Sequence, residues 1–130
     1  MLKKLITLSF ILLTTVSYNN KAFSIEADIF VQSTVNRAAE TLGGNLTKEE
    51  RIDELKKIAL DTVDVNGIGM YSLGGHRKNL TEEQKKEYSV VFENYFLISF
   101  SSRLAEYSNP IIQVDSKEKI NDSYTIVSST

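Results

Sequence analysis

The run from Leu73 to Asn109 constrains this chain most, because it combines a turn, a capped start and one long, mostly apolar helix. The Thr81 hydroxyl can accept a hydrogen bond from the backbone of Gln84, and the Gln84 side chain can accept one from the backbone N–H of Thr81. This reciprocal pairing, a capping box, predicts that the helix begins just after Thr81.

The middle of this predicted helix has almost no polar face. Steps of about 100° per residue place one set of side chains on a single arc: Tyr88, Phe92, Tyr95, Phe96, Ser99, Phe100, Arg103 and Tyr107. Val90, Val91, Leu97 and Ile98 fall on the other sides. Such a helix is buried in protein or membrane, and polar residues interrupt it before the ~20 apolar residues of a bilayer span. The sequence therefore predicts burial inside a protein.

Residues 1–24 have the layout of a secretory signal peptide. Lys3 and Lys4 precede an apolar stretch from Leu5 to Val16, and a polar stretch ends at Ala22-Phe23-Ser24. Cleavage after Ser24 leaves residues 25–130 as one exported domain. The alternative is an uncleaved membrane anchor, but the apolar stretch is short for a span.

The composition after residue 24 excludes several function classes. That part of the chain has 12 basic and 17 acidic residues, and an acidic protein is a poor nucleic-acid binder. The absence of cysteine excludes disulfides, thiol chemistry and cysteine metal sites. A chain of this length can bury a single core, so we expect one domain.

Two helices are expected before the connector that leads to the long helix. Apolar residues at helical spacing predict a helix from about Ala27 that ends at Gly43-Gly44. Thr47 and Glu50 form a second capping box, which predicts a helix that continues to about Thr62. A short helix is expected at 66–73, closed by Gly74-Gly75.

Two strands are expected after Pro110. Ile111, Ile112 and Val114 predict the first strand, 115–122 a polar connection, and alternation over 124–129 the second strand. A two-stranded hairpin is marginal alone. We therefore expect the sequence to be C-terminally truncated, with only the helices and the first strands of a larger domain present.

Signals of enzyme chemistry are weak. His76 is the only histidine, and no local serine and acid accompany it in a catalytic arrangement. Gly67-x-Gly69 and Gly74-Gly75 lack the lysine and serine of a phosphate-binding loop. The sequence thus predicts no enzyme, no metal site and no cofactor.

The aromatic arc leaves two interpretations open, an ordinary core or the wall of a ligand site. Arg103 lies within the arc and needs an anionic partner. Glu106, one helical turn further on, is the expected partner.

Several motifs in succession resemble one family. These are Leu46-x-x-Glu49-Glu50-Arg51, Val63-Asp64-x-x-x-Ile68, Leu73-Gly74, the His76-Arg77-Lys78 turn, Thr81-x-Glu83-Gln84, Phe92-Glu93-x-Tyr95 and Ser102-Arg103-Leu104-x-Glu106-Tyr107. Together they resemble the MlaC-type periplasmic phospholipid-binding proteins, also called toluene-tolerance auxiliary proteins. The family often has an aromatic near position 76, where this chain has histidine, and its members continue beyond position 130.

The resemblance implies an α+β fold in which N-terminal helices pack on a curved mixed β-sheet, a cone-shaped lipid-binding fold. It implies a periplasmic carrier that shuttles phospholipid between an outer-membrane lipoprotein–porin complex and an inner-membrane ABC transporter with an MCE-domain subunit. Such transport maintains the lipid asymmetry of the outer membrane. Phospholipid is then the cargo, without any cofactor.

On this hypothesis, the apolar faces of the helices form the wall that contacts the acyl chains. The candidates are Val31, Val35, Leu55, Ile58, Ile68, Leu73, Phe92, Phe96 and Phe100. Arg77 and Lys78 are candidates for contact with the head group or a partner protein.

Two alternatives remain open. An exported small-ligand binding domain or enzyme of a related α+β fold would place polar groups such as Tyr71 or Tyr95 deep in its pocket. An exported interaction domain would use its aromatic residues only as core.

Overall fold

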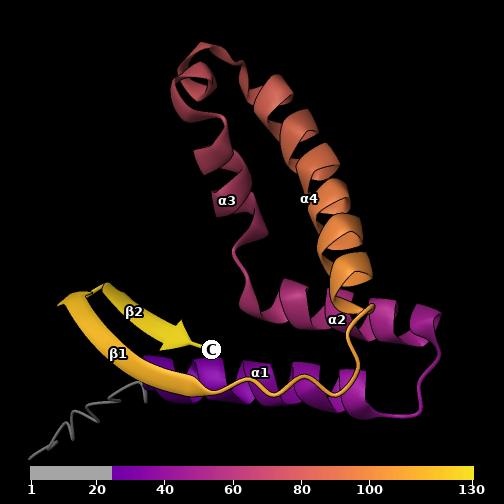
Figure 1. Ribbon diagram of the computed structural model, residues 1–130. Coiled ribbons are helices and arrows are strands. Elements are labelled where there is room, and N and C mark those ends of the chain that lie inside the picture. The colour runs from indigo at the N-terminus through magenta and orange to yellow at the C-terminus, as the bar shows by residue number, and fades with distance from the viewer. Residues whose placement is uncertain (1–24) are drawn as a thin grey trace, which may run out of the picture.

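The computed structural model describes residues 25–130 and has an α+β fold in which helices precede strands (Figure 1). Its elements are α1 (Ala27–Gly43), α2 (Lys48–Thr62), α3 (Val65–Ser72), the 3-10 helix η1 (Gly74–Asn79), α4 (Glu82–Leu104), β1 (Val114–Asn121) and β2 (Tyr124–Ser129). The signal peptide predicted at residues 1–24 lies outside the described residues.

Local hydrogen bonds begin the helices where the sequence predicts. Both capping boxes form: the Thr47 hydroxyl accepts from the backbone of Glu50, and the Thr81 hydroxyl accepts from the backbone of Gln84. The carboxylate of Asp64 caps α3 by accepting from the backbone N–H of Gly67 at 2.9 Å. These bonds satisfy backbone donors that have no partner within the helix.

The helices pack as two units that meet at α2. One unit contains α1, which packs on α2 and on both strands. The other is the pair α3 and α4, which lie side by side and rise away from α2 in Figure 1. A small core joins α1, α2 and the end of α4 through Leu42, Leu55 and Ala105.

The exposure of α4 differs from the burial that its composition predicts. The prediction holds for Leu97, which is buried, whereas Val91, Tyr95 and Ile98 are 61%, 69% and 58% exposed. The reason is that, within residues 25–130, α4 packs mainly on α2 and α3, so these elements cover two of its sides and leave its outer side open. The helix also ends at Leu104, before the expected limit near Asn109.

The first strand was predicted in the wrong place. Residues 111 and 112 lie outside any strand, and β1 is formed by Val114–Asn121, most of which was expected to be a polar connection. The physical reason is that pairing with β2 supplies the backbone hydrogen bonds, whatever the polarity of exposed side chains. The second strand was predicted correctly as Tyr124–Ser129, and it runs antiparallel to β1.

Candidate functional site

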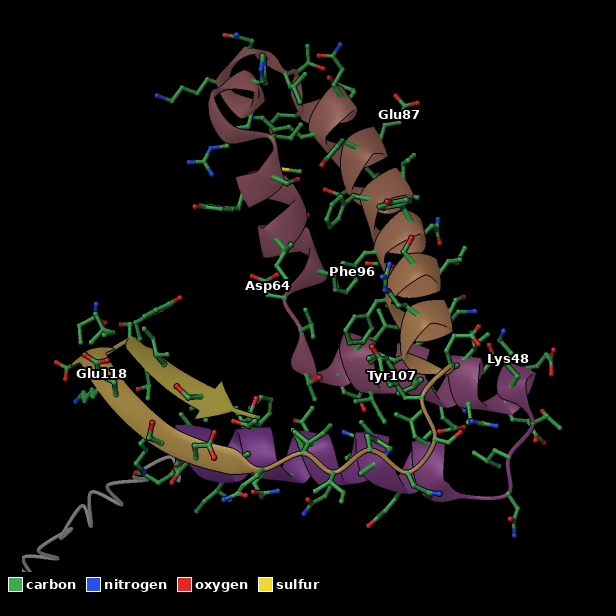
Figure 2. The ribbon with its side chains drawn as sticks, viewed as in Figure 1. Lys48, Asp64, Glu87, Phe96, Tyr107 and Glu118 are labelled. Atoms are coloured by element: carbon green, nitrogen blue, oxygen red, sulfur yellow. The ribbon has the colours of Figure 1, made fainter. Side chains whose placement is uncertain are left out.

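Four aromatic rings on successive turns of α4 form a continuous stack, which we term the aromatic ladder: Tyr88, Phe92, Phe96 and Phe100. Successive ring centroids are 5.7, 6.1 and 5.4 Å apart, and the planes of the last two rings differ by 9°. The spacing of four residues puts all four side chains on one face of the helix. Figure 2 shows Phe96 on the side of α4 that faces α3.

The short helix α3 fixes the first half of the ladder. A side chain at Gly69 would place its Cβ 2.8 Å from Cδ1 of Phe92, so the absence of one lets the ring pack directly on the α3 backbone. The hydroxyls of Ser72 and Tyr88 share a hydrogen bond of 2.8 Å. The next residue on α4, Ser89, donates its hydroxyl to the side-chain oxygen of Asn66 at 2.7 Å. These contacts hold the rings in place before any ligand arrives.

Phe100, at the C-terminal end, is the most exposed ring of the ladder. Tyr88, Phe92 and Phe96 are half-buried, and Phe100 is 36% exposed. The neighbouring face of α4 is closed, since Leu97 and Ser101 are buried. The accessible apolar surface of the ladder therefore lies at its Phe100 end.

The structure distributes the predicted acyl-facing residues over four helical elements and one helix end. Phe92, Phe96 and Phe100 come together as rungs of the ladder. The others lie elsewhere: Leu55 and Ile58 are buried on α2, Val31 and Val35 are half-buried on α1, Ile68 is exposed on α3, and Leu73 is half-buried at the end of α3.

Two residues of the site were not among the sequence candidates. Tyr88 is the first rung of the ladder, and its position four residues before Phe92 was the available signal. The second is Gly69, on whose backbone the ring of Phe92 packs. Nothing in the local sequence identifies it, because its role depends on the approach of α4 to α3.

A groove of about 780 Å³ lies between α1 and β1, away from the ladder. Most of the residues that line it are polar or charged, among them Gln32, Asn36, Glu40 and Asp115. None of the predicted acyl-facing residues lines it. Its charged side chains would lose water on contact with an acyl chain, which costs free energy, so the ladder is the better candidate site.

The charged residues that flank both ends of α4 are exposed. Arg77 and Lys78 lie in η1, at the end of the α3–α4 pair that is farthest from α2 in Figure 1. The expected pair of Arg103 with Glu106 is not among the ion pairs of residues 25–130. Glu106 lies beyond the end of α4 and pairs with Lys48 on α2. The hydrogen bond from Lys48 lowers the pKa of the Glu106 carboxyl. This pair ties the end of α4 to the start of α2.

Two further properties concern residues 25–130 alone. No cluster of three or more histidine, aspartate or glutamate side chains is arranged there to hold a metal ion. No helix in that part of the chain combines the length and apolar character needed to cross a membrane.

Comparison with known protein families gives a match over most of the chain. The model of the family described as MlaC protein matches residues 31–130. No curated protein and no solved structure matches the chain.

Proposed function

The chain belongs to the MlaC family, and on that premise we propose that it is a non-catalytic carrier of phospholipid in the periplasm. Membership of this family indicates a phospholipid-binding component of lipid transport. The proposed cargo is a diacyl phospholipid, whose acyl chains need an apolar surface during passage through water.

The aromatic ladder is the observation that supports this proposal. Its rungs form a continuous apolar strip along α4, and the strip ends at the partly exposed ring of Phe100. We infer that an acyl chain packs along the Phe96–Phe100 end. Stacked rings in fixed positions suit this role, because a preformed wall loses little side-chain entropy when a chain binds.

The energetics of acyl transfer explain why such a wall is needed. Each CH₂ group that moves from water to an apolar surface gains ~0.8 kcal/mol. The two chains of one phospholipid therefore favour a site that covers most of their length, while the polar head group stays near water. We propose Arg77 and Lys78 for contact with a partner protein, or with the head group of a lipid whose acyl chain runs along the ladder toward Phe100, because both are exposed at the opposite end of the α3–α4 pair.

The proposed partners follow from family membership. The carrier would receive and deliver lipid at an inner-membrane ABC transporter with an MCE-domain subunit and at an outer-membrane lipoprotein–porin complex. Its contribution would be to maintain the lipid asymmetry of the outer membrane. Export to the periplasm would depend on the signal peptide predicted at residues 1–24.

Native mass spectrometry of the protein recovered from the periplasm without detergent tests whether it carries lipid. The expected result is a mass increment equal to a diacyl phospholipid. A protein that is consistently free of phospholipid would contradict the proposal and favour a domain whose aromatic residues serve only as core.

A matched pair of variants tests the ladder itself. Phe100→Ser removes an apolar side chain at the exposed end of the ladder, and Ile98→Ser removes one from the outer side of α4, where Ile98 is 58% exposed. Loss of the Phe100 contact should reduce retained phospholipid about tenfold, whereas the Ile98 control should retain it. Equal retention by both variants, with unchanged melting curves, would exclude Phe100 from the site.

A further inference from the structure

The connector between α3 and α4 concentrates positive charge on a chain that is acidic as a whole after residue 24. η1 contains His76, Arg77 and Lys78 and no acidic residue. Elsewhere in residues 25–130, three basic residues never follow one another. We term η1 the basic tip, because it lies at the end of the α3–α4 pair that is farthest from α2 in Figure 1.

The described chain does not neutralise this charge. Arg77 and Lys78 are exposed, and neither is among the ion pairs of residues 25–130. The start of α4 is nearly balanced in itself, since its first six residues contain three acids and two lysines, and Lys85 pairs with Glu82 at 2.7 Å. A net positive charge therefore remains at the basic tip.

The three basic side chains diverge from one another. A 3-10 helix has three residues per turn, so successive side chains leave it about 120° apart. His76, Arg77 and Lys78 are successive in η1, and all three are exposed. Divergent cations are poorly placed to meet on one phosphate or one carboxylate, as tight binding of a single anion requires. They suit a surface on which negative charge is spread over an area.

The basic tip is also open to close approach by a flat surface. A Cβ at Gly74 or Gly75 would meet no atom within 4 Å, so no neighbouring group shields the turn. Tyr71, in the last turn of α3, is 82% exposed. Tyrosine is enriched where an apolar phase meets water, because its ring is apolar and its hydroxyl is polar. Positive charge, open backbone and an exposed tyrosine thus occur together at this end of the molecule.

We propose that the basic tip docks on the surface of a membrane that contains anionic phospholipids. The choice of a membrane as partner rests on the proposed function, since a phospholipid carrier collects and delivers its cargo at membranes. Head groups in the plane of a bilayer provide negative charge spread over an area. The acidic remainder of the chain is repelled by such a surface, so the protein approaches it with the basic tip first.

Two variants of equal net charge test this docking. Arg77→Gln/Lys78→Gln removes two positive charges from the basic tip, and Lys56→Gln/Lys57→Gln removes two from α2, where both lysines pair with acids of the same helix. In co-sedimentation at low salt, vesicles with equal parts of phosphatidylcholine and phosphatidylglycerol should bind the wild type and the α2 variant. The partition coefficient of the tip variant should be about thirtyfold lower. Vesicles of phosphatidylcholine alone should bind none of the three proteins.

A tryptophan reporter tests which end of the molecule touches the membrane. The chain contains no tryptophan, so Tyr71→Trp adds a single reporter beside the basic tip. Tyr124→Trp adds one on β2, where Tyr124 is 61% exposed. When the anionic vesicles are added, emission from position 71 should move to shorter wavelength, because the indole ring leaves water for the head-group region. Emission from position 124 should stay unchanged.

Three outcomes would overturn the proposal: a wild type that does not bind the anionic vesicles, charge variants that lose binding equally, or reporters that respond alike. Each would favour an acidic protein surface as the partner of the basic tip. Native mass spectrometry of the wild type keeps this test separate from the carrier function. A protein that carries phospholipid but binds no vesicles contradicts the docking alone. One that binds vesicles but never carries phospholipid contradicts the carrier function alone.

Discussion

Phe92 lies at the centre of the aromatic ladder, and its position depends on the missing side chain of Gly69. The ring stacks between Tyr88 and Phe96 while one edge of it packs on the α3 backbone. This contact joins Gly69 and Phe92, which are far apart in the sequence. It determines how closely α3 and α4 approach each other.

Gly69→Ala should destabilise the protein. Replacing glycine inside a helix by alanine gains about 1 kcal/mol of helix propensity. Against this, the new Cβ would lie 2.8 Å from Cδ1 of Phe92, and overpacking costs about 1–3 kcal/mol. The cost should exceed the gain, because the stacked neighbours of Phe92 limit its movement. Urea denaturation should show a free energy of unfolding lower by about 1 kcal/mol.

Gly75→Ala is the control for this prediction. A Cβ at Gly75 meets no atom within 4 Å, so the substitution should leave stability unchanged or raise it slightly. If Gly69→Ala were as stable as Gly75→Ala, the ring of Phe92 would be free to move and α3 would not fix the ladder.

At the scale of elements, two helices begin with the same hydrogen-bonding pattern but different chemistry. The box at the start of α2 uses the carboxylate of Glu50, and the box at the start of α4 uses the amide of Gln84. Hydrogen bonds from the backbone and then the side chain of Thr47 lower the pKa of Glu50 below its ordinary value of 4.5. Only the first box can therefore be weakened by protonation of its own acceptor.

The Glu50→Gln variant should separate the charge from the geometry of this box. A carboxyl whose pKa is lowered on folding stabilises the fold above its unfolded pKa, and this contribution is lost as the pH falls through the folded pKa. Wild type should thus be more stable than Glu50→Gln at neutral pH, and the difference should disappear in acid. Thermal melts of both proteins over a pH series measure it. A difference that stays constant with pH would show that the Glu50 charge does not contribute.

At the scale of the whole molecule, one lysine joins the last elements to the first. The ammonium group of Lys117 on β1 donates to the carboxylates of Glu26 and Asp28 at the start of α1, at 2.8 Å each. The bond with Lys117 lowers the pKa of Asp28, and the bonds with Asp28 and then Glu26 raise the pKa of Lys117. This contact positions the hairpin on α1.

Lys117→Met should loosen the hairpin without affecting the α3–α4 pair. Hydrogen-exchange protection should fall in β1 and β2 and stay unchanged in α4, which serves as an internal control. The contribution of Asp28 is present above its ordinary pKa of 3.8 and is lost as the pH falls through its lower folded pKa. The contribution of Lys117 is present below 10.5 and is lost as the pH rises through its higher folded pKa.

The protection of wild type and variant should therefore converge at both extremes of pH. A variant with unchanged hairpin protection at neutral pH would show that the packing of β1 and β2 on α1 suffices without the ion pairs. Exposed ion pairs often contribute little stability. The comparison therefore tests whether the Lys117 pairs contribute to the hairpin at all.

Much of the helical structure was predictable from sequence, and the residues involved show why. Thr47 and Glu50, like Thr81 and Gln84, are only three residues apart, so their hydrogen bonds form as soon as the helix does. The rungs Phe92, Phe96 and Phe100 are likewise four residues apart on one helix face. Such features depend on the local chain alone.

Other features depended on which elements meet. The sequence by itself determined the helix starts, the position of β2 and the common face of the ladder, because their interactions span a few residues. Only the tertiary structure decided that the ring of Phe92 packs on Gly69 and that β1 forms from polar residues. It also decided that Val91 and Ile98 stay exposed. The physical reason is that burial and strand pairing are properties of two surfaces in contact, and the residues of either surface do not specify the other.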